Sequence, residues 1–361
     1  MPGPHPSVAR AFPGPALARA ALTTVLVTGL GAGAAAMPGR AAQAADNAAP
    51  ATPVSVTIGG LDLHDGIIVQ GGDRVYAYGT RYGCGFNWLH RSQWCGYGVS
   101  EAASLTGRWS RPKLLFSARS VIRASWKGDN GKTWDAMCGG VGCFNPRMVR
   151  APDGKYLLWF NAPGDKSRHA NPYWVMTCTG LAGPCGDPHK PSIWGCSEGG
   201  DFSIAVAAGQ QSASIICSGA HHDLTTESLT RSFTNGTRVI DTRIAPGQNE
   251  GVGVYFSGGL YTAVFSDPIC GYCSGPPISK AAARGDPVEV RAGYSTAPSL
   301  AGPWTYDGIL SDGFCTGQPR STFTVNGRGW EWVDEWNGTT RETGARIHLI
   351  PLGLTPWSCA A

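Results

Sequence analysis

The sequence predicts an all-β protein, and three features of its composition and patterning support this fold class. Glycine is frequent, at 51 of 361 residues, and aromatic residues make up 10% of the chain. Charged residues reach only 15%, against about 25% in a typical globular protein. Short aromatic or β-branched runs alternate with glycine-containing turns, and no long segment has helical periodicity. These features exclude a disordered chain, a coiled coil and a long-helix protein.

One motif recurs five times along the chain: a turn with glycine, followed by a short strand-like run. The five copies are Gly71–Thr80, Asp153–Asn161, Gln210–Gly219, Gly258–Asp267 and Gly327–Trp336. A second motif begins Leu-x-Gly and occurs at Leu105–Trp109, Leu181–Cys185 and Leu300–Trp304. Irregular repeats of small all-β units are typical of propeller blades with variable loops. We therefore predict a five-bladed β-propeller; a β-sandwich with long loops is the alternative.

The N-terminal segment has the features of a secretory signal peptide. Residues 1–44 contain three arginines and no acidic residue, and Ala20–Ala36 is small and apolar. Ala42–Ala44 matches an A-x-A cleavage site. We predict a signal peptide over 1–44, a single propeller domain over 45–361 and a secreted, extracellular protein. The alternative, a membrane anchor, needs a longer uninterrupted apolar run than this segment contains.

The cysteines agree with export. All 12 follow the predicted signal peptide, and an even count in an exported protein indicates disulfides. Pairing in sequence order gives Cys84–Cys95, Cys138–Cys143, Cys178–Cys185, Cys196–Cys217, Cys270–Cys273 and Cys315–Cys359. The last pair would hold the final strand in place. A zinc site at Cys270 and Cys273 is the alternative for that pair, but a second close pair of cysteines is missing.

The charge of the chain indicates which partners to expect. Without the three arginines of the predicted signal peptide, 26 Lys and Arg stand against 25 Asp and Glu, a net charge of +1. A nearly neutral, charge-poor surface argues against nucleic acid or an anionic membrane as partner. It suits a neutral polysaccharide or oligosaccharide, and we expect a monomer.

Three blades carry a carboxylate just before the repeated hairpin, where the innermost strand should lie. They are Asp65, Asp201 and Glu250. Inner strands of a propeller direct one end into a shared funnel, so these groups are expected to meet. The two remaining blades have Asn145–Arg147 and Gly317–Pro319 at this position. Turn residues or solvated edge charges are the alternatives for the carboxylates.

The order of these motifs resembles the five-bladed glycoside hydrolases of family 43, especially the galactanase-like branch. That family has an Asp in blade one, often after His, an Asp in blade three, and a Glu before Gly or Ala in blade four. The runs similar to the galactanase-like branch are Asn145–Phe160, Cys315–Phe323, Asp334–Asn337 and Ile347–Leu352. The resemblance implies a glycosidase acting on arabinose-, galactose- or xylose-containing polysaccharides. Exo-action is slightly preferred over endo-action, because long cysteine-rich loops could close one end of the funnel.

The same resemblance implies hydrolysis with inversion. Glu250 would be the general acid and Asp65 the general base, with carboxyl groups about 6.5–9.5 Å apart. Asp201 would raise the pKa of Glu250. The chain departs from the pattern, because members of the galactanase-like branch often lack the blade-one Asp and have a Gln where Gln318 lies. Gln318 is therefore predicted as a sugar ligand or as a substitute for the base.

His64, Arg147 and Trp88 complete the predicted substrate-binding set. His64 is alternatively a packing or orienting residue, and Arg147, like Arg320, alternatively forms an ordinary ion pair. Trp88 lies in a loop with Trp94, Trp126 and Trp134, which either stack on sugar rings or pack around the nearby cysteines.

No cofactor is required by this interpretation, and we expect no metal site. A structural calcium on the propeller axis is known in the resembled family, but the sequence offers no complete set of oxygen ligands for it. Adjacent histidines at His221 and His222 point to opposite faces of a strand and so make a poor metal site.

Two alternatives for the function remain. The first is a non-catalytic carbohydrate-binding propeller, which needs no acid–base pair. The second is a sialidase-like hydrolase of another propeller clan, which needs a cluster of arginines and repeated Asp-box turns. Only one such turn is present, at Lys127–Trp134.

Overall fold

A computed structural model of the chain describes eleven segments, all between Thr52 and Ala361. The described residues are 55–87, 92–118, 131–139, 142–164, 171–196, 200–219, 223–245, 249–267, 291–311, 317–335 and 345–352. The predicted signal peptide lies outside them. In the part of the chain that the structure describes, no helix is long and apolar enough to cross a membrane.

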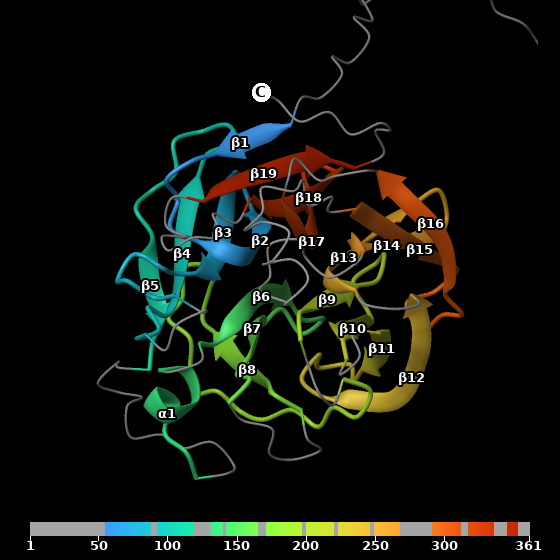
Figure 1. The fold of residues 1–361 in the computed structure, drawn as a ribbon, viewed down its shortest axis with the longest axis horizontal. Coiled ribbons are helices and arrows are strands. Elements are labelled where there is room, and N and C mark those ends of the chain that lie inside the picture. Colours follow the sequence, from blue (N-terminus) through green and yellow to red (C-terminus); the bar gives the residue numbers. More distant parts are fainter. Residues whose placement is uncertain are drawn as a thin grey trace, which may run out of the picture. The chain divides into compact units, whose positions relative to one another are not determined.

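Five antiparallel sheets stand as blades around a common centre (Figure 1), which confirms the predicted five-bladed β-propeller over the sandwich. Blade one contains β2 (His64–Gly71), β3 (Arg74–Thr80), β4 (Tyr97–Ala102) and β5 (Lys113–Phe116). Blade two contains β6 (Phe144–Arg150), β7 (Tyr156–Asn161) and β8 (Tyr173–Cys178). Blade three contains β9 (Phe202–Val206), β10 (Ala213–Ser218), β11 (Leu224–Leu229) and β12 (Gly236–Ala245).

The last two blades complete the ring. Blade four contains β13 (Glu250–Ser257), β14 (Leu260–Asp267), β15 (Arg291–Ala297) and β16 (Thr305–Ser311). Blade five contains β17 (Gln318–Val325), β18 (Arg328–Glu335), β19 (Arg346–Pro351) and β1 (Val56–Ile58). One short helix, α1 (Trp134–Cys138), lies in the described loop segments between blades one and two. Inner strands β2, β6, β9, β13 and β17 contact one another around the centre.

The five repeated motifs correspond to the hairpin turn and second strand of each blade, β3, β7, β10, β14 and β18. In two blades the turn consists of two residues with positive φ, Gly258–Gly259 (59° and 86°) and Asn326–Gly327 (51° and 74°). This is the backbone of a type I′ turn, whose twist matches that of the strands it joins. The repeat was readable in the sequence because this turn chemistry is local.

The ring is closed by strand pairing between the two ends of the propeller. β1 pairs with β19 through Val56–Leu349 and Ile58–Ile347, so the first strand completes the last blade. Residues far apart in the sequence thereby share one sheet. The disulfide that we expected to hold the final strand, Cys315–Cys359, lies outside the described residues.

Four of the predicted disulfides are present: Cys84–Cys95, Cys138–Cys143, Cys178–Cys185 and Cys196–Cys217. Cys270 and Cys273 lie outside the described residues. The four bonds close segments of only 5 to 21 residues, so each fixes a loop or strand end within its own part of the ring. Disulfides of this kind fit an oxidising compartment.

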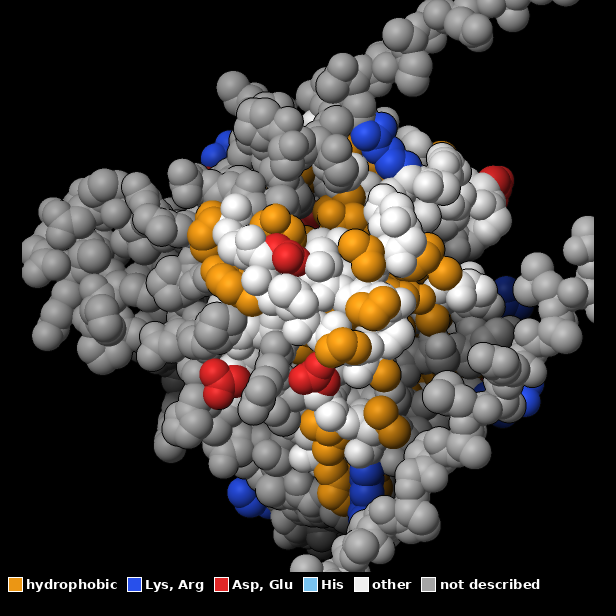
Figure 2. Space-filling model, turned by 90° about the vertical axis from the view of Figure 1, so that its right-hand side faces the viewer, with side chains coloured by type: hydrophobic (Ala, Val, Ile, Leu, Met, Phe, Trp, Pro, Cys, Tyr) orange, Lys and Arg blue, Asp and Glu red, His pale blue; other side chains and the backbone are white. Residues whose placement is uncertain are grey.

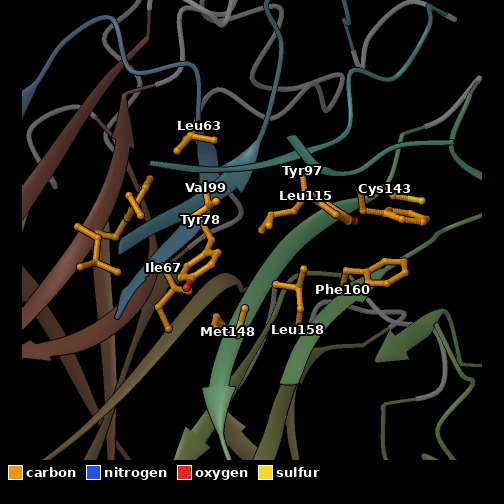
Figure 3. Packing of buried hydrophobic residues seen from close by; sticks show 14 of the residues in the cluster. Leu63, Ile67, Tyr78, Tyr97, Val99, Leu115, Cys143, Met148, Leu158 and Phe160 are labelled. Carbon is orange, nitrogen blue, oxygen red and sulfur yellow. The ribbon is translucent and has the colours of Figure 1, made fainter. Parts of the chain in front are cut away.

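The core lies between blades rather than at the axis. Figure 3 shows the joint of blades one and two, where Ile67 and Tyr78 face Met148 and Leu158. Each large apolar side chain buried there stabilises the fold by roughly 1.5–3 kcal/mol. The joint continues outward through rings that include Tyr97 and Phe160, whose centroids are 5.4 Å apart.

Apolar side chains also remain on the outer strands. Val239 and Ile240 on β12 and Ile309 on β16 are 53%, 38% and 39% exposed. Figure 2 shows orange side chains scattered between white ones on the side of the molecule that carries these strands.

Candidate active site

The predicted carboxylates occupy equivalent places at the starts of inner strands. Asp65 is the second residue of β2, Asp201 immediately precedes β9, and Glu250 is the first residue of β13. Gln318 begins β17, and Asn145 is the second residue of β6. All five blades therefore direct a polar side chain from the same end of the inner strand.

A backbone irregularity recurs at these strand starts. The pairing register shifts between His64 and Ile67, between Phe144 and Arg147, between Glu250 and Val252, and between Pro319 and Ser321. At three of the shifts a residue has positive φ: Asp65 at 50°, Asn145 at 56° and Gly251 at 55°. Such bulges bend the strand and redirect its side chains, which explains how regular strands turn polar groups toward one point.

Asp201 is the centre of a tight polar cluster. Arg320 donates from Nη1 to Oδ2 at 2.5 Å and from Nη2 to Oδ1 at 3.1 Å. Asn145 Nδ2 donates to Oδ1 at 3.0 Å, and the Arg320 guanidinium also bonds to Oδ1 of Asn145. Burial raises the pKa of Asp201, but the charge of Arg320 and the hydrogen bonds from Arg320 and Asn145 outweigh it and lower the pKa. Asp201 is therefore an anion at neutral pH.

Gln318 connects Asp201 to Glu250. Its Nε2 lies 3.4 Å from Oδ2 of Asp201 and 3.4 Å from Oε2 of Glu250. Its Oε1 accepts a hydrogen bond of 2.7 Å from Nη1 of Arg320. Because Arg320 has only donors, this bond fixes which end of the amide faces the two carboxylates. Asp201, Glu250 and Gln318, from blades three, four and five, thus lie together at the centre of the ring.

The residue that follows Glu250 is a glycine, Gly251, because the neighbouring blade lies very close to it. A Cβ at Gly251 would lie 2.0 Å from the carbonyl oxygen of Pro319 in blade five. The inner strands of blades four and five therefore approach so closely that only glycine fits. That approach places Glu250 within reach of Gln318.

Asp65 is held from two sides. Its carboxylate accepts hydrogen bonds from Thr80, at 3.2 Å from the main-chain nitrogen and 3.0 Å from Oγ1. Its own main-chain nitrogen donates to Oδ2 of Asp334 at 2.6 Å. The other oxygen of Asp334 lies 3.2 Å from Nδ1 of His64 and 3.0 Å from Nε1 of Trp332. Asp65 is only 1% exposed, so this arrangement restrains it strongly.

The surroundings of Asp65 and His64 raise the pKa of both side chains. Burial raises the pKa of Asp65 to about 6, against the opposing charge of Arg320. For His64, burial opposes the imidazolium, but the hydrogen bond and charge of Asp334 outweigh it and raise the pKa. A carboxyl group with a pKa near 6 can accept a proton at neutral pH and return it, as a general base must.

The structure assigns Arg147 a role other than the predicted substrate contact. Its side chain is fully buried. It donates to the carbonyl oxygens of Phe202 (3.0 Å), Asp65 (2.5 Å), Gly66 (3.0 Å) and Arg320 (2.9 Å). Arg147 therefore joins the inner strands of blades one, three and five and is not available to a sugar. We correct the substrate-binding prediction on this ground.

His64 and the described tryptophans of the Trp88 loop are buried in the protein. His64 is fully buried and packs edge-on against Tyr82, with ring centroids 5.5 Å apart, which is the orienting position rather than a sugar contact. Trp88 lies outside the described residues, as does Trp126. Trp94 and Trp134 are 2% and 1% exposed, so they pack in the core instead of stacking on sugars.

Sequence reasoning missed the roles of Asn145 and Asp334. In the sequence, Asn145 stands out only as a strand start without an acid, and Asp334 only as part of a longer motif. The aligned places at the strand starts were a usable signal for Asn145. No local pattern pointed to Asp334, because its partners His64 and Asp65 lie at the other end of the chain.

The residues present do not fit a calcium ion among the inner strands. The main-chain oxygens of Asp65, Gly66, Phe202 and Arg320 accept from the Arg147 guanidinium, and a second cation beside it would be repelled. Within the described segments, no group of three His, Cys, Asp or Glu side chains is placed to hold a metal. His221 and His222 lie outside them.

The fold and site define a five-bladed propeller with a polar, carboxylate-containing centre, and known structures share this architecture. No family model and no curated protein matches the chain. Among solved structures, a GH43 β-1,3-galactosidase is similar with a TM-score of 0.59 and 16% identity over 80% of this chain and 56% of that one. An exo-β-1,3-galactanase from Phanerochaete chrysosporium is similar with a TM-score of 0.58 and 16% identity over 81% of this chain and 60% of that one.

Similarity extends to an endo-1,4-β-xylanase from Bacteroides thetaiotaomicron, at TM-score 0.56 and 15% identity over 84% of this chain and 97% of that one. The chain thus has the propeller fold of family 43 glycoside hydrolases. It spans only 56–61% of the length of the first three structures that it resembles.

Proposed function

We propose that this protein is a secreted glycoside hydrolase that cleaves galactose-containing polysaccharides, with β-1,3-linked galactan as the first substrate to test. The observation that carries the proposal is the hydrogen-bonded cluster of Asp201, Glu250 and Gln318 at the centre of the ring. The galactosidase and galactanase titles of similar structures support the choice of sugar.

Glu250 is the general acid of the proposed reaction. It is half-buried, so it can meet a substrate, and it lies at the strand start that directs side chains to the centre. It protonates the departing glycosidic oxygen, a role worth roughly 10²–10⁴-fold in rate.

Asp201 acts mainly as a positioning group. Its negative charge favours a protonated Glu250, but the ion pair with Arg320 offsets much of that charge. What remains is geometry: Asp201 and Arg320 together hold the Gln318 amide against Glu250. Removing either Asp201 or Arg320 would therefore release the Gln318 amide from its position beside Glu250.

Asp65 is the general base of the inverting mechanism, and Gln318 is the second candidate for assisting the water. The raised pKa of Asp65 favours the first assignment. The burial of Asp65 and its bonds to Thr80 favour the second, because Gln318 lies directly beside Glu250. Asp65→Asn and Gln318→Ala, assayed side by side, separate the two. A loss of about 10²–10⁴-fold in kcat in Asp65→Asn supports Asp65 as the base, whereas a nearly unchanged kcat in Asp65→Asn together with such a loss in Gln318→Ala supports Gln318.

The test of the function compares wild-type protein with Glu250→Gln on β-1,3-galactan, arabinan and xylan, with released sugars separated by chromatography. We expect product from the wild type and almost none from the folded variant. Asp153→Asn is the matched control, because Asp153 is an exposed turn residue. Equal product from Glu250→Gln and wild type would refute the acid assignment.

The same experiment separates the alternatives. Retained binding to a polymer without hydrolysis would indicate the non-catalytic carbohydrate-binding propeller. The sialidase-like alternative needs arginines that face a substrate carboxylate, but Arg147 and Arg320 both bond to groups of the protein. Among the described residues, these are the two arginines in the centre of the ring.

A further inference from the structure

A cavity of about 420 Å³ lies at the joint of blades five and one. Its polar lining includes Gln70, Arg74, Thr106, Asn326 and Arg328, with Trp330 as its aromatic side chain. Gln70 stands five residues along β2 from Asp65, which is about 16 Å in a strand. The cavity is therefore at the opposite end of the inner strands from the candidate active site.

The second repeated sequence motif lies at this joint and at two other joints between blades. At the joint of blades one and two, the carbonyl of Leu181 accepts a hydrogen bond of 2.6 Å from Tyr78, and a Cβ on Gly71 would meet the Leu181 side chain at 2.1 Å. At the joint of blades three and four, the carbonyl of Leu300 accepts from Thr226 at 3.4 Å. The corresponding Leu105 lines the cavity.

Arg328 is the chemical centre of the cavity. Its guanidinium carbon lies 5.4 Å from the ring centroid of Trp330, so the cation is stacked on an aromatic face. Arg328 has no ion-pair partner in the part of the chain that the structure describes. Arg74, by contrast, lies 3.3 Å from Glu101. Asp73 also lines the cavity, so the lining carries two arginines, one of them already paired with Glu101, and one aspartate.

Gln70 and Asn326, which both line the cavity, are hydrogen-bonded to each other. Gln70 Nε2 donates to Oδ1 of Asn326 at 2.8 Å, and the main-chain nitrogen of Asn326 donates to Oε1 of Gln70 at 2.8 Å. The pair links the hairpins of blades one and five. Gln70 Nε2 also donates to the carbonyl oxygen of Gly72 at 3.4 Å. These side chains line the same cavity as Arg328 and the hydroxyl-bearing Thr106.

We propose that this cavity is a second, non-catalytic saccharide site that binds a carboxylate-bearing sugar, that is, a uronic acid residue. A guanidinium recognises a carboxylate through two parallel hydrogen bonds, and its stacking on Trp330 reduces the freedom lost on binding. The amides and hydroxyl match the hydroxyl groups of a sugar ring. The volume lies in the range of small-ligand sites, about 300–1,000 Å³.

The test uses NMR titration of the full-length mature protein with D-glucuronate, followed through the side-chain amide signals of Gln70 and Asn326. D-glucose and acetate are titrated separately as the neutral sugar and the simple anion. We expect saturable shifts with glucuronate and none with glucose or acetate at the same concentrations. Arg328→Gln should weaken glucuronate binding about tenfold or more, and Arg328→Lys, which keeps the charge without the planar fork, by less.

Arg150→Gln is the matched control, because Arg150 is an exposed arginine at the equivalent end of the inner strand of blade two. It should leave the affinity unchanged. The absence of saturable shifts in the folded wild type overturns the proposal, as does an equal response to acetate or an unaffected Arg328→Gln variant. Because the measurement needs no turnover, its outcome is separate from that of the proposed hydrolysis.

Discussion

The carboxylate of Asp334 accepts a hydrogen bond of 2.6 Å from the main-chain nitrogen of Asp65, across the joint of blades five and one. The two residues are 269 positions apart in the sequence. The bond supports the left-handed backbone of Asp65, whose φ is 50°. A buried side chain of the last blade therefore sets the position of the proposed base in the first.

Replacing Asp334 should destabilise the protein strongly. Asp334→Ala removes the acceptor for Asp65, His64 and Trp332 and leaves buried donors unpaired. We expect a loss of about 3–5 kcal/mol in the free energy of unfolding, measured by urea denaturation. Asp153→Asn, at an exposed turn, should change it by less than about 0.5 kcal/mol. A small loss in Asp334→Ala would contradict the role of this carboxylate in closing the ring.

Gly251 should tolerate no side chain. Gly251→Ala combines positive φ with a Cβ 2.0 Å from the carbonyl oxygen of Pro319, so the inner strands of blades four and five must separate. Gly258→Ala is the matched control, since φ is +59° there and nothing lies within 4 Å of the added Cβ. The control should lose about 1–2 kcal/mol from strain alone, and Gly251→Ala clearly more. Thermal unfolding of both variants measures the difference; equal losses would exclude a tight inter-blade contact.

The raised pKa of Asp65 predicts a pH dependence of stability. The folded state holds the proton up to a pKa of about 6, against an ordinary value of 3.8, so the folded state binds more protons between these values. Stability should therefore fall as pH rises from about 4 to 6, by about 3 kcal/mol for this group. Asp65→Asn should lack this part of the slope.

The measurement is urea denaturation of the wild type and Asp65→Asn at several pH values over that interval. Asp187→Asn, at an exposed carboxylate away from the centre of the ring, should keep the wild-type slope. If the wild type and Asp65→Asn change in parallel, the protonation of Asp65 is not linked to folding.

Arg147 should prove to be a structural residue. Arg147→Met keeps much of the side-chain volume but leaves the carbonyl oxygens of Phe202, Asp65 and Arg320 without their donor. We expect about 3–5 kcal/mol of destabilisation, as for breaking a buried charged network, whereas exposed Arg150→Met should cost less than about 0.5 kcal/mol. A folded, stable Arg147→Met protein with only a raised KM would restore the substrate-binding prediction.

The blades and four of the disulfides could be predicted because their signals are local. A type I′ turn such as Asn326–Gly327 and the strands beside it are encoded by adjacent residues, and cysteines close in sequence pair easily. The starts of the inner strands are recognisable in the same way, so the sequence points to Asp201, Glu250 and Gln318 without knowledge of their contacts.

The role of each polar side chain depends on contacts between blades. Arg147 links three other blades because the folded chain surrounds it with main-chain oxygens. His64 is an orienting residue because Asp334 reaches it from blade five. The closing strand β1 likewise depends on a partner nearly 300 residues away. The repeated β-hairpins and the candidate carboxylates follow from short-range patterns, so the order of the residues is enough to predict them. Burial, hydrogen-bond partners and charge compensation depend on residues that meet only when the ring closes, so only the folded chain assigns them.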